Sequence, residues 1–262
     1  MSSPATSTAT AIDAARIEEA GLNALQTQRQ LFYDGWILRL SPGSAKRARS
    51  VNAHFASSLP IGQKIAYCES TYARCSLPTI FRLTPFCHPG NLDELLHHAG
   101  YVAFDQTLVQ AMLLDAPPAA ADLDDESEVR TVDPASFAEA VGALRGSSAV
   151  QREAHLERLR ASPLVSRMVV VRVRDAIVAA AQMAGEGDIV GLFDVVTAPD
   201  ARRRGYARAA VAALFAWAYE RAFATVYLQV NASNAAAIAL YRALGFSTVY
   251  TYHYRGRPGA CE

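Results

Sequence analysis

In the second half of the chain, apolar residues gather in short β-branched runs that predict strands and in alanine-rich stretches that predict helices. Residues 168–174 (MVVVRVR) and 176–184 (AIVAAAQMA) flank Asp175, a pattern typical of a β-hairpin. Four more runs predict strands, at residues 129–132, 189–196, 225–230 and 246–255. The alternation of strands and helices predicts an α/β (α+β) fold, with a mixed central sheet flanked by helices.

Capping residues mark the ends of the helices in this half. The predicted helices cover residues 134–146, 148–161, 205–221 and 234–244. Asp133 followed by Pro134 is typical of a helix start, because aspartate caps free N–H groups and proline tolerates the first helical position. Gly245 stands where a helix end favours a residue with positive φ.

The first half of the chain repeats this outline. Residues 68–84 predict the end of a helix followed by a strand, as residues 216–230 do. Residues 92–101 (LDELLHHAGY) parallel residues 239–246 (ALYRALGF), and residues 102–113 predict a closing strand. The repetition predicts two modules of similar construction.

A change of composition separates these modules. Residues 115–128 (DAPPAAADLDDESE) replace the periodic apolar pattern with prolines, small residues and six acids, which predicts a linker. We therefore expect domains at residues 1–114 and 129–262, with residues 1–10 disordered. The formal charges of the three segments are +1, −6 and +5, so the net charge of zero hides a basic C-terminal half.

Composition excludes several classes of protein. With 51% hydrophobic and 19% charged residues, the chain has enough apolar side chains for real cores and is not disordered or fibrous. Because 25 basic residues balance 25 acidic ones, we expect no partnership with nucleic acid or membranes. The four cysteines form no C-x-x-C pair, and the sequence shows no long apolar run or signal peptide, so we expect a cytoplasmic protein without a metal site.

One segment of the C-terminal half combines cations with a glycine. It runs Arg202, Arg203, Arg204, Gly205, Tyr206, Ala207 and Arg208. A strand feeding a tight turn at the start of a helix offers free N–H groups and the helix dipole to an anion. The segment is not a Walker loop, and a basic surface turn without function is the alternative interpretation.

A second pattern lies on the following helix. Asn234 and Tyr241 are seven residues apart, so they lie on one face of a helix and can line one side of a cleft. Taken singly, Asn234 can merely cap the helix and Tyr241 can pack in the core. Their position downstream of the arginine-glycine segment favours a joint role.

Together these motifs resemble the GCN5-related N-acetyltransferase (GNAT) family. Arg202 to Ala207 match its acetyl-CoA signature, Q/R-x-x-G-x-G/A, and Asn234 to Phe246 match N-x-A-A-x-x-L-Y-x-x-x-G-F. The resemblance implies that the amides of residues 203–208 hold the pyrophosphate of acetyl-CoA and that Val195, Val196 and Thr197 pair with its pantetheine arm. It also implies that Asn234 binds the pantetheine and that Tyr241 protonates the departing thiolate.

The general base is less well defined by the sequence. In relatives that acetylate protein N-termini, a glutamate occupies the position of Gln229, and an amide cannot act as a base. Asp194 is the nearest remaining carboxylate in the sequence and is our candidate, acting directly or through water. A structural role for Asp194, as a solvated carboxylate or a partner of the arginines, is the alternative.

The first half departs from the family pattern. Residues 58–63 (SLPIGQ) replace the arginine-glycine turn, and the Asn/Tyr pair is absent, so we expect a degenerate GNAT-like domain without acetyl-CoA chemistry. Residues 36–52 place cations between two predicted strands. Some of these cations, among them Arg39 and Arg49, are expected to face an inter-domain cleft and bind an anionic group of the acceptor, unless the segment is a solvated basic loop.

These observations predict an N-acetyltransferase that moves the acetyl group of acetyl-CoA, as cosubstrate, directly to a primary amine. We expect a small metabolite, an amino acid or an amine toxin as the acceptor, and a homodimer is possible. Acetylation of protein N-termini or lysines is the alternative within enzymes, and Gln229 weakens it. An acyl-CoA-binding sensor without turnover is the alternative outside them.

Overall fold

A computed structural model describes residues 12–25, 27, 29–41, 45–116, 123 and 126–259. The predicted disorder of residues 1–10 lies outside these residues, as does most of the predicted linker at residues 115–128. The described helices are α1 Ala14–Asn23, α2 Ile61–Arg74, α3 Leu92–His98, α4 Pro134–Arg145, α5 Ala149–Ala161, α6 Tyr206–Glu220 and α7 Ala235–Ala243, with 3-10 helices η1 Lys46–Ala48 and η2 Pro199–Ala201.

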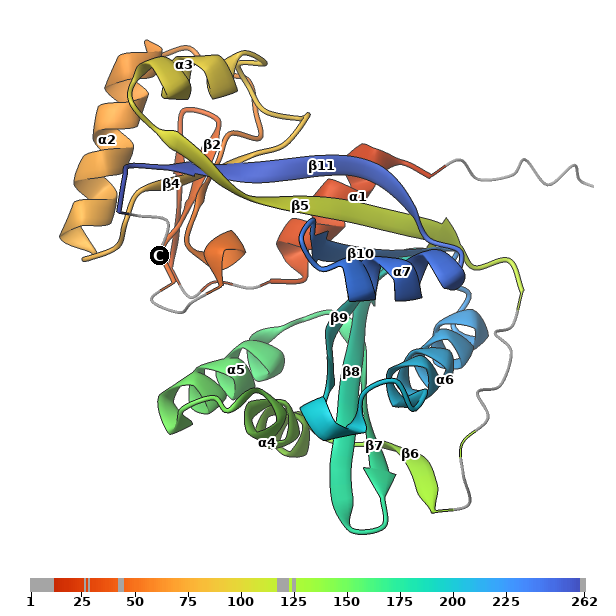
Figure 1. Ribbon diagram of the computed structural model, residues 1–262. Helices are drawn as coiled ribbons and strands as arrows, with labels where there is room; N and C mark the ends of the chain where they lie inside the picture. Colours follow the sequence, from red (N-terminus) through yellow and green to blue (C-terminus); the bar gives the residue numbers. More distant parts are fainter. Residues whose placement is uncertain are drawn as a thin grey trace, which may run out of the picture.

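The strands of the described residues join in one mixed sheet, in the order β1-β2-β3-β4-β11-β5-β10-β9-β8-β7-β6 (Figure 1). They are β1 Gln30–Tyr33, β2 Trp36–Arg39, β3 Val51–Asn52, β4 Ile80–Leu83, β5 Val102–Leu113, β6 Ser127–Thr131, β7 Val165–Val173, β8 Ala176–Glu186, β9 Ile189–Thr197, β10 Thr225–Asn231 and β11 Ser247–Gly256. The pairs β3–β4 and β9–β10 are parallel, and the other pairs are antiparallel. The predicted α/β (α+β) fold is confirmed.

The closing strand of each half lies beside the other half's strands. β5 pairs with β10 of the second half, and β11 pairs with β4 of the first half. The two closing strands also pair with each other at the centre of the sheet. The predicted domains, residues 1–114 and 129–262, therefore share one continuous sheet and exchange one strand each.

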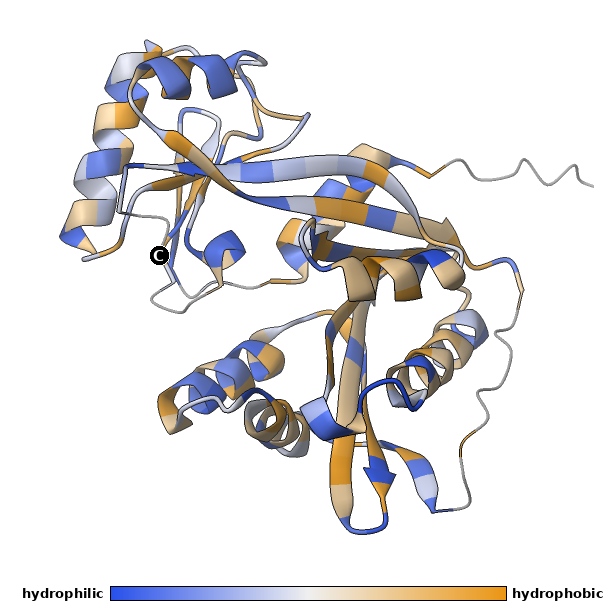
Figure 2. Cartoon of the chain, viewed as in Figure 1, coloured by the Kyte–Doolittle hydropathy of each residue, from blue (hydrophilic) through white to orange (hydrophobic). Residues whose placement is uncertain are grey.

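Helices cover both faces of the strands in the second half (Figure 1). Successive residues of β7 point to opposite faces: Val170 packs with Phe137 of α4, whereas Val171 packs with Leu214 of α6. Because both faces are buried, β7 and β8 carry apolar runs instead of a polar alternation. Figure 2 shows this hydrophobic colour along β8 and many hydrophilic residues on α5.

Helix α1 of the first half lies against strands of the second half. Ile17 and Ala20 belong to a buried cluster with Val109 of β5 and Tyr227 of β10. At Gly21 a Cβ atom would stand 2.8 Å from Nε2 of Gln229, so a larger residue here would require the end of the Gln229 side chain to shift. The N-terminal segment thereby reaches the strand that carries Gln229.

The capping residues act as the sequence predicts. Asp133 accepts hydrogen bonds from the N–H groups of Ala135 (2.9 Å) and Ser136 (3.1 Å) at the start of α4. Gly146 and Gly245 follow α4 and α7 with φ values of 67° and 97°, the left-handed conformation that glycine adopts without strain. The predicted helices and strands of the second half are confirmed to within a few residues.

Candidate functional site

The parallel strands β9 and β10 separate partway along their length. Their pairing runs from Ile189–Thr225 to Leu192–Leu228 and then stops, although both strands continue. Beyond this point β9 still pairs with β8, and β10 still pairs with β5. Residues 193–197 therefore keep one backbone edge free, and an extended ligand can add to such an edge like a strand.

A bulge at Asp194 accompanies this separation. Asp194 has φ 51°, and the pairing of β8 with β9 shifts register between Ala180 and Gln182. A cavity of about 450 Å³ opens beside the bulge. It is lined by β8, β9 and β10, by α4, α5 and α7, and by Ala24, Leu25, Ala45 and Arg47 of the first half.

The arginine-glycine segment forms the turn that starts α6. Arg203 and Gly205 have φ values of 65° and 85°, and Gly205 is the N-cap. The first helical hydrogen bond runs from Ala209 N–H to the Gly205 carbonyl (3.0 Å), so the N–H groups of residues 206–208 have no helical acceptor. A Cβ atom at Gly205 would meet nothing within 4 Å, which leaves room for a ligand at the turn.

Asn234 and Tyr241 lie on one face of α7 and line the cavity together with Ala237, as their spacing predicts. Asn234 is the N-cap, and its Oδ1 accepts the N–H of Ala237 at 3.1 Å. Its side-chain NH₂ group is not used in this bond. Capping and ligand binding are therefore compatible at Asn234.

Tyr241 is buried against Phe246, with ring centroids 5.8 Å apart. Within the described part of the chain, its hydroxyl has no hydrogen-bond partner. Burial raises the pKa of Tyr241 to about 12, so the phenol keeps its proton at neutral pH. The side chain thus presents a protonated, unoccupied donor to the cavity.

Asp194 also lines the cavity, where three side chains hold it. Arg145 Nη1 lies 2.9 Å from Oδ1, and Gln182 Nε2 donates to Oδ2 at 2.7 Å. His155 Nε2 stands 3.2 Å from Oδ2. Burial alone would raise the pKa of Asp194, but the hydrogen bond of His155 and the charge of Arg145 bring it well below its usual range. Asp194 itself is consequently a weak proton acceptor.

The imidazole of His155 lies beside Asp194 and is a second candidate for accepting a proton. A carboxylate only accepts hydrogen bonds, so Nε2 of His155 carries the hydrogen towards Asp194. The other ring nitrogen, Nδ1, takes no part in this contact. His155 lines the same cavity as Tyr241, which places an acceptor and a donor of protons in one space.

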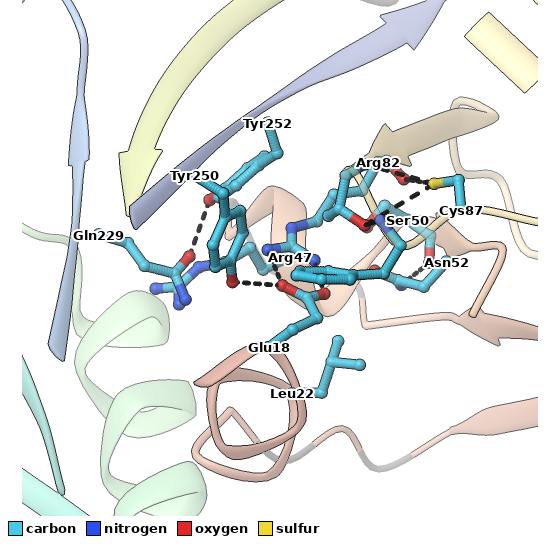
Figure 3. A network of polar contacts seen from close by, with 12 residues as sticks. Glu18, Leu22, Arg47, Ser50, Asn52, Arg82, Cys87, Gln229, Tyr250 and Tyr252 are labelled. Atoms are coloured by element: carbon cyan, nitrogen blue, oxygen red, sulfur yellow. Dashed lines mark hydrogen bonds and ion pairs between the residues drawn. The ribbon is translucent and has the colours of Figure 1, made fainter. Parts of the chain in front are cut away.

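Gln229 is held in a buried polar network that reaches the first half (Figure 3). Tyr252 donates its hydroxyl to Gln229 Oε1 at 2.9 Å, and the Arg82 guanidinium lies 3.9 Å from the centre of the Tyr252 ring. Tyr250 donates to Glu18 Oε2 at 2.7 Å, and Arg82 forms an ion pair with Glu18. Gln229 therefore acts as a fixed amide at the cavity wall.

The sequence interpretation missed several cavity residues. They are His155 and Arg158, which come from α5. Arg47 of η1 lies in the segment of residues 36–52, some of whose cations are expected to face a cleft, and it lines the cavity. One signal was available in the sequence: the residues of α5, AVQREAHLERLRA, are polar around most of the helix, which suits a helix beside a polar cavity. Arg39 and Arg49, expected to face a cleft, are not among the residues that line the cavity.

The described residues contain no cluster of three or more His, Cys, Asp or Glu side chains that could hold a metal ion. Among the helices of the same residues, none has both the length and the apolar character needed to cross a bilayer.

Comparison with known proteins agrees with this geometry. Residues 135–246 match the model of the Acetyltransferase (GNAT) family. Over 226 residues the chain is 24% identical to the uncharacterized N-acetyltransferase YobR of Bacillus subtilis (strain 168), which covers 84% of this chain and 89% of that protein.

A second relative matches a shorter stretch. Sixty residues, 23% of the chain, are 47% identical to the ribosomal protein bS18-alanine N-acetyltransferase of Escherichia coli (strain K12) and cover 40% of that enzyme. Among solved structures, the GCN5-related N-acetyltransferase from Kribbella flavida superposes with a TM-score of 0.72 at 18% identity, covering 94% of this chain and 95% of that one.

The family match includes Asp194, the turn of residues 202–208, Asn234 and Tyr241. Residues 135–246 thus match an acetyltransferase of the GNAT family in both sequence and site geometry. The protein is an acetyl-CoA-dependent N-acetyltransferase.

Proposed function

We propose that this protein transfers the acetyl group of acetyl-CoA directly to the primary amine of a small acceptor. The observation that carries the proposal is the separation of β9 from β10, which opens onto the cavity holding Asp194, His155 and Tyr241. A small metabolite, an amino acid or an amine toxin fits a cavity of about 450 Å³ that also receives the thioester.

The residues present suit the binding of acetyl-CoA. The pyrophosphate is assigned to the free N–H groups at the start of α6, with Arg202, Arg203, Arg204 and Arg208 supplying positive charge. Val195, Val196 and Thr197 offer their unpaired edge to the amides of the pantetheine arm, and Asn234 offers its NH₂ group. This arrangement directs the thioester towards Tyr241.

The proposed reaction is a direct substitution at the thioester carbonyl. The neutral amine attacks the carbonyl carbon, a C–N bond forms and the C–S bond breaks. The amine loses one proton and the departing sulfur gains one, so that an acetamide and free CoA leave. Tyr241 donates its proton to the sulfur, and the site contributes mainly by holding the two reactants together.

The proton of the amine is assigned to the Asp194–His155 pair. Asp194 was chosen from the sequence as the base, and its low pKa favours a role through His155, whose Nδ1 accepts the proton. Asp194 keeps the ring in the required tautomer and orientation. Gln229 takes no part in proton transfer.

We propose that the first half is a degenerate GNAT-like domain without acetyl-CoA chemistry. Just before α2, at the position that corresponds to the arginine-glycine turn, the bound anion is the carboxylate of Asp34. Asp34 accepts the N–H groups of Ser58 (3.0 Å) and Leu59 (2.9 Å) and lies 3.1 Å from Lys64 Nζ. Asp34 thus occupies the N–H groups just before α2, and residues 58–63 carry no arginine that could attract a pyrophosphate.

The proposal is tested by incubating the protein with acetyl-CoA and a panel of amines while free thiol and acetylated product are measured. Acceptor-dependent release of thiol with a small amine supports it. Turnover only with protein N-termini or lysine side chains would favour a protein acetyltransferase. Tight binding of acetyl-CoA without turnover of any amine would favour a sensor.

A further inference from the structure

The wall of the cavity carries more positive charge than negative charge. Among its described lining residues are the cations Arg47, Arg145 and Arg158, and one carboxylate, Asp194. Arg145 already pairs with Asp194 at 2.9 Å. Two guanidinium groups, those of Arg47 and Arg158, therefore face the cavity without a carboxylate of their own.

Arg47 is held in place by its surroundings. Lys46, the preceding residue, forms an ion pair with Asp105 of β5, and the carbonyl of Arg47 accepts a hydrogen bond from Arg39 Nη1 at 3.4 Å. Nη1 of Arg47 is buried and has no hydrogen-bond partner among the described residues. A buried, unpaired donor of a charged group is costly, and Arg47 lines the cavity, so an anion bound there would offset part of this cost.

The buried charged residues near Arg47 are Arg39, Arg82 and Glu18, and they include no unpaired carboxylate. Arg39, which contacts the Arg47 carbonyl, and Arg82 are both buried, and Glu18 is the only buried carboxylate among the described residues. Figure 3 shows Glu18, Arg47 and Arg82. Glu18 is committed to Arg82 and to the hydroxyl of Tyr250. Burial, followed by the charges of Arg82 and Arg47, lowers the pKa of Arg39 to about 10, as expected for cations crowded together.

Arg158 approaches the cavity from the second half of the chain. It lies one helical turn after His155 on α5, so both side chains share the face of the helix that lines the cavity. No hydrogen bond joins Arg158 to another described residue. Burial lowers the pKa of Arg158, and the charge of Asp194 acts in the opposite direction. The two halves thus each supply one arginine that forms no ion pair with the described residues.

We propose, on the basis of the function proposed above, that the acceptor is a primary amine bearing a carboxylate, as an amino acid does, and that Arg47 and Arg158 bind this carboxylate. Guanidinium groups match the two oxygens of a carboxylate through paired hydrogen bonds. Acceptors with additional positive charges, such as polyamines, are repelled by the same arginines. The first half then contributes substrate specificity through Arg47.

The test uses pairs of acceptors that differ only in the carboxylate. The twenty amino acids and their carboxamides are each assayed with acetyl-CoA, and O-phosphoethanolamine and spermidine are included. Rates are compared per neutral amine, because amidation also lowers the pKa of the amino group. We expect at least one amino acid to exceed its carboxamide tenfold or more in kcat/KM.

Variants assign the preference to the two arginines. Arg47→Gln and Arg158→Gln should each lower the ratio of kcat/KM for acid over carboxamide at least tenfold, mainly through KM of the acid, with the KM of acetyl-CoA unchanged. Arg160→Gln is the matched control, because Arg160 is an exposed residue of the same helix outside the cavity. Since α5 buries no residue, Arg158→Gln remains informative even if Arg47→Gln fails to fold.

Several outcomes would overturn the inference. They are equal or better turnover of the carboxamides, of spermidine or of O-phosphoethanolamine, and an unchanged preference in both arginine variants. In those cases acetyl transfer to an amine still occurs, so the proposed function stands and only the acceptor class is wrong. Failure to bind acetyl-CoA or to acetylate any amine would remove the proposed function and this inference together.

Discussion

Both carboxylate oxygens of Asp93 of α3 accept hydrogen bonds from the guanidinium group of Arg255 of β11. Oδ1 accepts from Nε at 2.6 Å and Oδ2 accepts from Nη2 at 3.1 Å, while His253 Nε2 lies 2.7 Å from Oδ1. The pair joins a helix of the first half to the closing strand of the second half. A variant of this pair therefore tests how strongly β11 is attached to the first half.

Acid should weaken this contact in a defined pH range. The hydrogen bond of Arg255 lowers the pKa of Asp93 to about 2, from an ordinary value of 3.8. A lowered carboxylate pKa contributes stability that is complete above pH 3.8 and is lost as the pH falls towards 2. Asp93 is partly exposed, so Asp93→Asn should lower the free energy of unfolding at pH 7 by about 1 kcal/mol.

Urea unfolding of both proteins between pH 7 and pH 2 measures this effect. The difference between wild type and Asp93→Asn should shrink towards zero below pH 3.8. Asp175→Asn, in the exposed turn between β7 and β8, is the control and should change stability little. A difference that stays constant across the range would show that the charge of Asp93 is not the cause.

Removal of the Tyr241 hydroxyl should affect turnover and little else. Tyr241→Phe is expected to lower kcat by about 10²-fold, the usual contribution of a general acid. Acetyl-CoA affinity and stability should hardly change, because the hydroxyl has no partner in the described part of the protein. Since the pKa of Tyr241 is about 12, ionisation of this phenol should not limit wild-type kcat near pH 9.

Steady-state kinetics and calorimetric binding of acetyl-CoA distinguish these effects. Tyr219→Phe, which alters an exposed tyrosine of α6, should behave as wild type. If kcat of Tyr241→Phe equals that of wild type, the leaving thiolate receives its proton elsewhere.

A large side chain at Gly205 should weaken the binding of acetyl-CoA. Gly205→Trp places a ring in the open space beside the free N–H groups, and the expected loss of acetyl-CoA affinity is at least about tenfold, equivalent to 1.4 kcal/mol. Positive φ adds strain of about 1 kcal/mol with any side chain. Gly187→Trp is matched, since Gly187 also has positive φ and open surroundings, in the turn between β8 and β9.

Isothermal titration with acetyl-CoA, together with circular dichroism of both variants, provides the measurement. Unchanged affinity in a folded Gly205→Trp protein would place the pyrophosphate away from the start of α6.

Neutralising Asp194 should impair proton removal from the amine. Asp194→Asn keeps the shape of the side chain but removes the charge that orients His155, so kcat should fall about 10- to 100-fold. The kcat of His155→Gln should fall at least as far, because this variant removes the ring that accepts the proton. Asp188→Asn, in the exposed turn before β9, is the control. Normal kcat in both active-site variants would exclude the pair as the base.

Local features of this fold were readable from the sequence because they depend on neighbouring residues. Asp133, Gly146 and Gly245 mark helix ends through backbone geometry that acts within one turn. The joint position of Asn234 and Tyr241 follows from helical periodicity, and the turn at Gly205 follows from the glycine and its arginines. Each of these expectations agrees with the structure.

Long-range features were not readable. The exchange of β5 and β11 depends on which strands pair, and the apolar pattern of a strand does not determine which strand lies beside it. For the same reason, His155 and Arg145 could not be connected with Asp194, because they lie 39 and 49 positions earlier in the chain. Arg47 joins the cavity only through the packing of α1 and η1 on the second half.

The placement of β11 between β4 and β5 also constrains how the protein is made. A ribosome delivers β4 and β5 long before residues 247–256, so the nascent first half carries strand edges whose native neighbours, β10 and β11, are not yet made. Exposed edges of this kind can pair with other chains, which makes the growing polypeptide a natural client for chaperones. Both halves reach their final structure in the same late event, and neither is complete before it.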